Sequence, residues 1–257
     1  MTNTWQWLRK TVIIGFWLCL WQAAAFFIDN NIILVGPVEV FRCLAGLLFL
    51  PDFWKSIAGS FGKISAGFLT AFFSGVLTGS LAWRFSFVRE LLNPVISAVK
   101  SIPVASFVIL SLIWIGSENL SVFIAFLVVF PMIYTGTIAG LSSTDKQLLE
   151  MAQVFSMPAR KKLWYIYRPA LIPYLSSSCN TALGMSWKSG IAAEVIGVPA
   201  SSIGENLYMA KIYLSTEELF AWTLVIIVIS ALFEKLFLML LNLAAPAGLQ
   251  KRKEAKS

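Results

Sequence analysis

Long apolar stretches alternate with short polar ones along the whole chain of 257 residues. Six of the apolar stretches are about 18 residues or longer, the length that an α-helix needs to cross the hydrocarbon core of a bilayer. They cover residues 11–28, 64–83, 93–115, 120–141, 169–196 and 219–243. The pattern predicts an all-α, polytopic membrane protein with six transmembrane helices.

The polar segments between these stretches divide the chain into three parts. Residues 38–50 form a short amphipathic piece between Pro37 and Pro51, which is more typical of a helix lying on the membrane than of one crossing it. We therefore expect an N-terminal part at 1–53, a transmembrane domain at 54–243 with a polar loop at 142–168, and a basic tail at 244–257.

Small residues and prolines mark two of the predicted spans. Ala71, Gly75 and Gly79 fall four residues apart, so this face lets another helix approach closely, within the subunit or, as the alternative, across a dimer interface. Pro94 and Pro103 both lie in the third span, where they free backbone carbonyls at membrane depth. That suits a helix that lines a pathway, and a kinked packing helix is the alternative.

Composition excludes several other classes of protein. The chain is 58% hydrophobic and 13% charged, with a mean hydropathy of +0.78, which a soluble domain does not show. Its net charge of +7 is not gathered into a basic patch with interleaved aromatics, so we expect no nucleic-acid partner. Histidine is absent and the three cysteines lack paired spacing, which argues against a metal site or a disulfide framework.

The basic residues instead follow membrane topology. Thirteen of the 20 lysines and arginines fall on one side of the six-span arrangement, in the two terminal segments, the short loop at 84–89 and the polar loop at 142–168. The positive-inside rule then places both termini and the polar loop in the cytoplasm of a prokaryotic plasma membrane. The apolar stretch after Arg9 and Lys10 lacks a clear small-x-small cleavage site, so we expect a retained span rather than a signal peptide.

The polar loop has the pattern of two short helices joined by a corner. Leu148, Leu149, Ala152 and Phe155 recur at helical spacing, and Thr144 or Asp145 can cap the first helix. Pro158 disfavours helical backbone at the residue before it, so this helix should end near Ser156. A compact knob of this kind can dock into a cleft on a soluble partner. The alternative is an interfacial loop whose aromatic side chains rest at the lipid headgroups.

Residues 145–173 also resemble the cytoplasmic EAA loop of binding-protein-dependent ABC importer permeases. That loop has a Glu-Ala-Ala triplet, a glycine six residues after the glutamate, and a Pro-x-x-x-Pro beyond. The matching positions here are Glu150, Ala152, Ser156, Pro169 and Pro173. The chain departs from the pattern at three places, with Met151 for the middle alanine, Ser156 for the glycine, and Pro158 for a common serine.

Three further segments resemble the nitrate/sulfonate/taurine branch of these permeases. The segment 60–68 is similar to the branch's Ser-Leu-x-Arg and Gly-Phe pair, with Lys63 for the arginine, and the segment 93–116 is similar to its proline-rich span. Trp187, Ala192, Ala193 and Glu194 match its Trp-x-x-x-x-Ala-Ala-Glu pattern.

The resemblance implies a type I ABC importer permease fold that works as two copies of the chain. It implies a cytoplasmic ATP-binding subunit and an extracytoplasmic solute-binding protein as partners, and a nitrate-, sulfonate- or taurine-like anion or a thiamine-precursor-like heterocycle as substrate. No Gly-x4-Gly-Lys-Ser/Thr loop is present, so ATP should bind the partner and this chain should hold no cofactor. The residues implied in docking are Gln147, Glu150, Met151, Ala152, Phe155, Ser156, Met157, Pro158 and Arg160.

The residues predicted to line the pathway are Lys100, Pro103, Trp187, Lys188 and Glu194. Charge within a membrane is costly and often functional, so Lys188 or Lys100 can meet an anionic substrate. The alternative is that each lysine pairs with a carboxylate or extends to the membrane interface. For Glu150 the alternative role is a surface ion pair with Lys146.

Two other functions stay open on the residues alone. One is an ATP-independent carrier or channel that uses Lys100, Lys188 and Glu194 as charge relays. We see no internal repeat between the two halves of the chain, which counts against this class. The other is a membrane scaffold that does not transport and that uses the polar loop for interaction.

Overall fold

The computed structural model describes residues 2–30 and 32–243, and this part of the chain is helical with no β-strand. The predicted basic tail at 244–257 lies outside the described residues. The helices are α1 (Thr2–Ile28), α2 (Pro37–Leu47), α3 (Pro51–Arg84), α4 (Ser86–Ser101), α5 (Val104–Ile115), α6 (Leu120–Ser142), α7 (Lys146–Val154), α8 (Ala159–Lys162), α9 (Arg168–Gly197), α10 (Ile203–Ile212) and α11 (Thr216–Leu243). A π-helical turn, Leu163–Tyr167, joins α8 to α9.

The centre of the bundle is α6, which packs against both α3 and α9. The small-residue face of α3 meets α6: a Cβ at Gly75 would lie 3.0 Å from the Cβ of Ile133, and one at Gly79 would lie 2.8 Å from the Cβ of Thr137. The absence of side chains therefore lets the two helices approach closely. The interpretation of this face as packing within the subunit is confirmed.

Aromatic side chains fill the space between α3, α9 and α11. Phe233 lies edge-on to Phe68, with the ring centroids 5.8 Å apart. The ring of Trp187 also packs against that of Phe233, with the centroids 6.2 Å apart. All three side chains are buried. Rings at these distances bury large apolar areas and favour edge-to-face contacts, so this cluster joins three helices that are far apart in sequence.

The stretch 93–115, predicted as one span, is instead two helices. Helices α4 and α5 meet at an angle of 108°. Pro94 is accommodated inside α4, whereas the break falls at Ile102 and Pro103. Ile102 has extended backbone (φ −80°, ψ 132°), as a residue before proline prefers, and Pro103 has no N–H to continue the helix.

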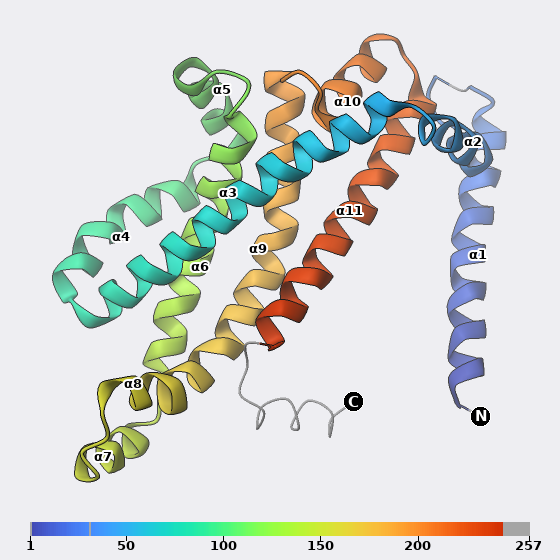
Figure 1. Cartoon of the computed structure of the whole chain (residues 1–257). Coiled ribbons are helices and arrows are strands. Elements are labelled where there is room, and N and C mark those ends of the chain that lie inside the picture. Colours follow the sequence, from blue (N-terminus) through green and yellow to red (C-terminus); the bar gives the residue numbers. More distant parts are fainter. Residues whose placement is uncertain (1, 31, 244–257) are drawn as a thin grey trace.

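The number of transmembrane spans remains a prediction, because the bent pair α4–α5 can be counted as a single span or as a re-entrant segment. Taken singly, α1, α3, α6 and α11 contain segments long and apolar enough to cross a bilayer, and the bent pair α4–α5 adds a fifth if it is one span. Helix α9 has 30 residues, about 45 Å, and so is long enough, but it is less apolar than these helices. Helix α3, with 34 residues, runs obliquely across the bundle (Figure 1).

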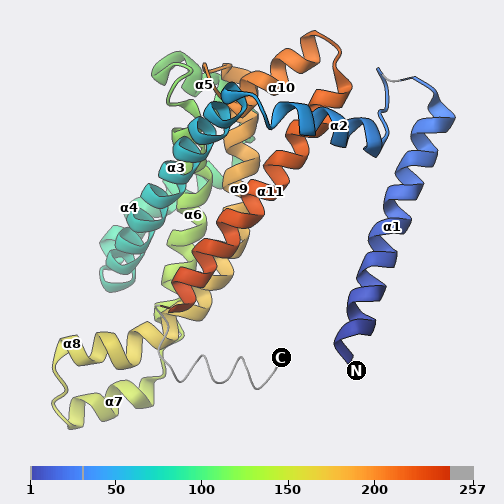
Figure 2. The ribbon, with the colours of Figure 1, turned by 45° about the vertical axis from the view of Figure 1, so that its right-hand side comes forward.

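Helix α1 stands apart from the bundle along most of its length (Figure 2). Trp21 anchors it: the indole N–H donates to the carbonyl of Val35 at 3.0 Å, and the ring lies 5.4 Å from that of Phe220. The amphipathic piece predicted at 38–50 is confirmed as α2, which packs against α11. Most of the apolar surface of α1 is thus left to lipid or to another chain.

The bundle has two unlike ends. Helices α2 and α10 lie at one end, together with the α5–α6 turn (Figure 1). At the other end α1 begins, α11 ends, and α7 and α8 project away from the bundle (Figures 1 and 2). The polar loop therefore lies at the same end of the bundle as the start of α1 and the end of α11, and the side of the membrane that this end faces remains a prediction.

Candidate functional site

Helices α7 and α8, with the corner between them, form a knob at one end of the bundle, which we call the α7–α8 knob. Its start is fixed by Asp145, whose carboxylate accepts a hydrogen bond from the backbone N–H of Gln147 at 2.9 Å. The hydroxyl of Thr144 instead donates to the carbonyl of Leu141 at the end of α6. Of the two predicted caps, Asp145 is therefore the one that begins α7.

The corner after α7 depends on left-handed backbone at Ser156, where φ is 48°. The N–H of Met157 donates to the carbonyl of Ala152 at 2.8 Å, and the N–H of Ser156 donates to that of Gln153 at 3.0 Å. This pair of bonds is a Schellman motif, which usually places glycine at the left-handed position. The resemblance has glycine at this same position, so the conformation is present although the residue differs.

Apolar side chains are exposed around this corner. Ala152 is buried, with 1% of its surface exposed, whereas Val154 and Phe155 expose 81% and 74%. Met151 and Leu148 are also exposed. Clustered exposed apolar residues with polar surroundings are typical of protein–protein contact sites.

Charged residues surround the apolar ones. Glu150 is exposed and forms no ion pair with Lys146, so the surface-pair alternative has no support in the structure. Arg160, Lys161 and Lys162 are clustered on α8, and the Arg168 guanidinium lies 4.2 Å from the ring centre of Trp164. The knob thus presents one free carboxylate and a group of basic residues beside its apolar corner.

The predicted pathway residues do not come together in one place. Trp187 and Glu194 lie inside the bundle, with 1% and 0% of their surfaces exposed. Lys188 is exposed on α9, while Lys100 is exposed on α4, close to the α4–α5 break at Pro103. The buried pair contacts other helices of the subunit, and only the two lysines and Pro103 lie on its surface.

Glu194 joins three helices at the α10 end of the bundle. Its Oε2 accepts hydrogen bonds from the Ser60 hydroxyl at 2.6 Å and from the N–H of Gly204 at 3.2 Å. Ser60 Oγ also accepts from the N–H of Ile203 at 2.8 Å. A side chain at Gly204 would collide with Glu194. A buried carboxylate with these donors connects α3, α9 and the start of α10.

A second connection lies at the same end. Lys63 Nζ is 2.8 Å from Glu118 Oε2, and the other carboxylate oxygen accepts from the N–H of Ala200. The Lys63 ammonium lowers the pKa of the Glu118 carboxyl below its usual range. Ser60 therefore links α3 to α9 and α10, and Lys63 links α3 to the turn between α5 and α6, although sequence analysis identified both residues only through a resemblance.

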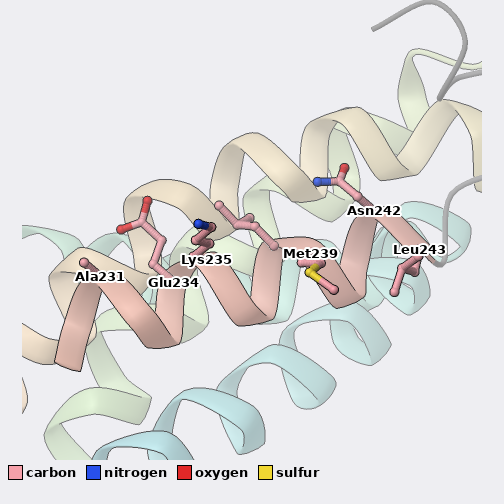
Figure 3. Close-up of a pocket in the computed structure, with 7 residues that line it drawn as sticks. Ala231, Glu234, Lys235, Met239, Asn242 and Leu243 are labelled. Atoms are coloured by element: carbon pink, nitrogen blue, oxygen red, sulfur yellow. The ribbon is translucent and has the colours of Figure 1, made fainter. Parts of the chain in front are cut away.

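Sequence analysis also missed two groups of polar residues. One consists of Arg89 and Tyr134, which line a cavity between α4 and α6 together with Lys100, a residue predicted for the pathway. The other is on α11, where Glu234 and Lys235 line a groove beside α9 with Asn242 further along the helix (Figure 3). Adjacent residues on a helix do not face each other, and the structure shows no ion pair between Glu234 and Lys235. The signal in the sequence that could have identified Glu234 and Lys235 is the presence of charged residues within an apolar helix.

The fold defines a class of protein: a polytopic α-helical membrane protein, here with the α7–α8 knob projecting at one end. Residues 67–247 match the family described as "Binding-protein-dependent transport system inner membrane component", and the chain belongs to this family. Among residues 2–30 and 32–243 no group of three or more side chains is placed to hold a metal ion.

Several curated proteins are similar over most of their length. The taurine transport system permease protein TauC of Escherichia coli (strain K12) is 24% identical over 87% of this chain and 82% of its own. The putative aliphatic sulfonates transport permease protein SsuC of Bacillus subtilis (strain 168) is 24% identical over 88% and 82%. The nitrate import permease protein NrtB of Synechocystis sp. is 22% identical over 93% and 90%. The chain is therefore a permease subunit of an ABC importer, which is a transport component rather than an enzyme.

Proposed function

We propose that two copies of this chain form the pathway of an importer for a small oxyanion. An extracytoplasmic solute-binding protein delivers the solute, and a cytoplasmic ATP-binding subunit drives the cycle by contact with the α7–α8 knob. The family supports this assembly, since its description names binding-protein-dependent transport. The chain itself has no P-loop sequence, which supports ATP hydrolysis in a separate subunit.

The knob is the observation that carries the proposal. Val154 and Phe155 are largely exposed at the end of α7, which projects away from the bundle (Figure 2). Burial of apolar surface contributes about 25 cal/mol for each Å² removed from water, so a partner that covers them gains affinity. The free carboxylate of Glu150 and the basic residues of α8 then supply charges that select the partner.

The substrate class is supported by the similar proteins and by charge. Their names give taurine, aliphatic sulfonates and nitrate, which all carry an oxyanion group. Lys188 is an exposed cation within the span predicted at 169–196, on the face of α9 that is turned away from the bundle. An ammonium at such a depth is stabilised by an anion, and we assign Lys188 to the pathway on this basis.

The test is purification of the tagged chain from native membranes in mild detergent, with mass spectrometry of the bound proteins. We compare the wild type with Glu150→Lys on the knob and with Glu90→Lys, the same charge reversal at an exposed position of α4. We expect a P-loop ATPase with the wild type and with Glu90→Lys, and about tenfold less of it with Glu150→Lys, because a reversed charge at a contact costs about 1.4 kcal/mol or more.

Two other results contradict parts of the proposal. An ATPase retained equally by all three proteins keeps the importer but places the contact elsewhere. No ATPase, under conditions that preserve a known importer complex, contradicts the ATP-driven mechanism and favours the carrier alternative. Transport by purified chain in vesicles with an ion gradient and no ATPase is the matching test of that alternative.

A further inference from the structure

A cavity of about 470 Å³ lies between α4 and α6, apart from the buried Glu194. Ligand pockets in proteins commonly have volumes of this order. Its walls come from the part of α4 before the break at Pro103 and from the last part of α6. Helix α6 ends at Ser142, which lines the cavity, and α7 begins at Lys146, so the cavity adjoins the knob.

The α4 wall is a continuous polar stripe. Arg89, Asn93, Ser97 and Lys100 follow one another at intervals of four, four and three residues, and all four line the cavity. Residues at this spacing share one face of a helix. The stripe therefore presents two cations, with an amide and a hydroxyl between them, to the same space.

The α6 wall adds a buried phenol. Tyr134 lines the cavity with only 1% of its surface exposed, and its hydroxyl has no hydrogen-bond partner among the described residues. The neighbouring Thr135 differs, because its hydroxyl donates to the carbonyl of Pro131 at 2.8 Å. A buried hydroxyl without a partner costs about 1–3 kcal/mol. A ligand atom that accepts a hydrogen bond from the Tyr134 hydroxyl would therefore be bound more tightly.

The charge of the cavity is not balanced by the chain. None of the ten residues that line it is acidic. Arg89 and Lys100 take part in no ion pair in the part of the chain that the structure describes. Both cations are exposed on the cavity side of α4, and the counter-ion that fits donors of this kind is an oxyanion.

We propose that this cavity is a binding site for an oxyanion such as a sulfonate, sulfate or phosphate group. Arg89 and Lys100 provide the charge, Asn93 and Ser97 donate from α4, and Tyr134 donates from α6. The class of ligand rests on these residues alone. Its assignment to the transported anion, on the side of the α7–α8 knob, rests on the proposed function. A phospholipid headgroup offers the same chemistry from the membrane.

The experiment measures binding by the purified chain in detergent, without any ATPase or transport. Thermal unfolding is followed at increasing concentrations of sodium sulfate, taurine or sodium phosphate, with sodium chloride at matched ionic strength as the reference. A ligand that binds the folded state raises the unfolding temperature, and the rise grows with the logarithm of ligand concentration above Kd, so the concentration dependence gives Kd. Native mass spectrometry of the same preparation detects retained phospholipid.

Four variants test the residues. We expect Arg89→Gln and Lys100→Gln each to raise Kd about tenfold, and Tyr134→Phe about fivefold, because charged hydrogen bonds contribute more than neutral ones. Lys100→Arg retains the charge and should retain binding. Arg42→Gln is the matched control, since it removes one exposed cation from α2 at the opposite end of the bundle.

The outcomes separate the sources of the ligand. A rise in unfolding temperature with a soluble oxyanion, lost in Arg89→Gln and Lys100→Gln, supports the transported anion. A phospholipid that is retained by the wild type and lost in the same variants supports the site with a membrane ligand. Equal behaviour of wild type, both glutamine variants and Arg42→Gln overturns the site. Because no ATPase is present, this failure is distinct from failure of ATPase capture.

Discussion

Ser156 shows how one residue can hold a conformation that favours another. Its φ of 48° lies in the left-handed region, which costs a residue with a side chain about 1–2 kcal/mol relative to right-handed backbone. The two hydrogen bonds to Ala152 and Gln153 offset this cost by closing the end of α7. The corner of the knob is therefore strained in a way that glycine would relieve.

We predict that Ser156→Gly stabilises the corner by about 1 kcal/mol, whereas Ser156→Val destabilises it by at least as much because a β-branched residue is least tolerated there. The measurement is the rate of limited proteolysis between α7 and α8 in the purified chain. Ser143→Gly is the control, since Ser143 is exposed with right-handed backbone. Faster cleavage of Ser156→Gly than of the wild type would contradict the explanation.

Glu194 differs in its surroundings from Lys100 and Lys188, the two lysines predicted to line the pathway. Charge within an apolar span indicated function for all of them, yet Glu194 is fully buried and accepts from Ser60 and Gly204. Lys188 is exposed and remains a candidate. A charged residue within an apolar span can therefore either join helices, as Glu194 does, or face outward, as Lys188 does.

At the scale of elements, the packing of α3 on α6 depends on glycine at chosen positions. A Cβ at Gly79 would lie 2.8 Å from Thr137 and 2.9 Å from the carbonyl oxygen of Tyr134. A Cβ at Gly62, on the same helix, would meet nothing within 4 Å. The two positions have the same helix propensity and differ only in what surrounds them.

We predict that Gly79→Ala lowers the free energy of unfolding by about 1–3 kcal/mol, because the methyl group must separate the two helices. Gly62→Ala should be neutral or stabilising by about 1 kcal/mol, since alanine favours the helix. Thermal unfolding of both variants in detergent, followed by size-exclusion chromatography, measures the difference. Equal stability of the two variants would show that the close approach of α3 and α6 is not needed.

The break between α4 and α5 is the second feature at this scale. It separates the part of the chain that carries Lys100 from an apolar helix at the other end of the bundle. Proline at position 103 explains why a helix stops there. It does not set the 108° angle, which depends on how α5 packs against α6 and α9.

At the scale of the whole molecule, the described chain leaves large surfaces uncovered. Helix α1 makes few contacts, the groove on α11 contains Glu234 and Lys235, and Lys188 is exposed on α9. The pathway that we propose for two copies would give Lys188 an aqueous surrounding and an anionic ligand. This is the scale at which transport itself is tested.

We predict that Lys188→Ala lowers uptake about tenfold at an unchanged protein level, because an ammonium that contacts an anion contributes about 1.5–3 kcal/mol. The measurement is uptake by the assembled importer of labelled taurine or nitrate, whichever the wild type transports, with immunoblots of the membrane. Lys211→Ala is the control, as Lys211 is exposed on α10 outside the long helices. Normal uptake by Lys188→Ala would remove this residue from the pathway.

Local features of the protein were determined by the sequence itself. The apolar stretches predicted the long helices, the amphipathic piece between two prolines became α2, and Asp145 was one of two expected caps. The corner near Ser156 followed from Pro158, and the close approach of α3 to another helix of the subunit followed from the glycine spacing. These features depend on neighbours within a few residues, so periodicity and turn chemistry are sufficient to predict them.

Tertiary structure decided what lies between distant residues. Ser60 and Glu194 are 134 positions apart, and nothing in either segment indicates that they share a hydrogen bond. The same holds for the cavity, whose cations are on α4 and whose phenol is on α6. Helix periodicity tells which residues share a face, but only the packing of helices decides which faces meet and which charges stay uncovered.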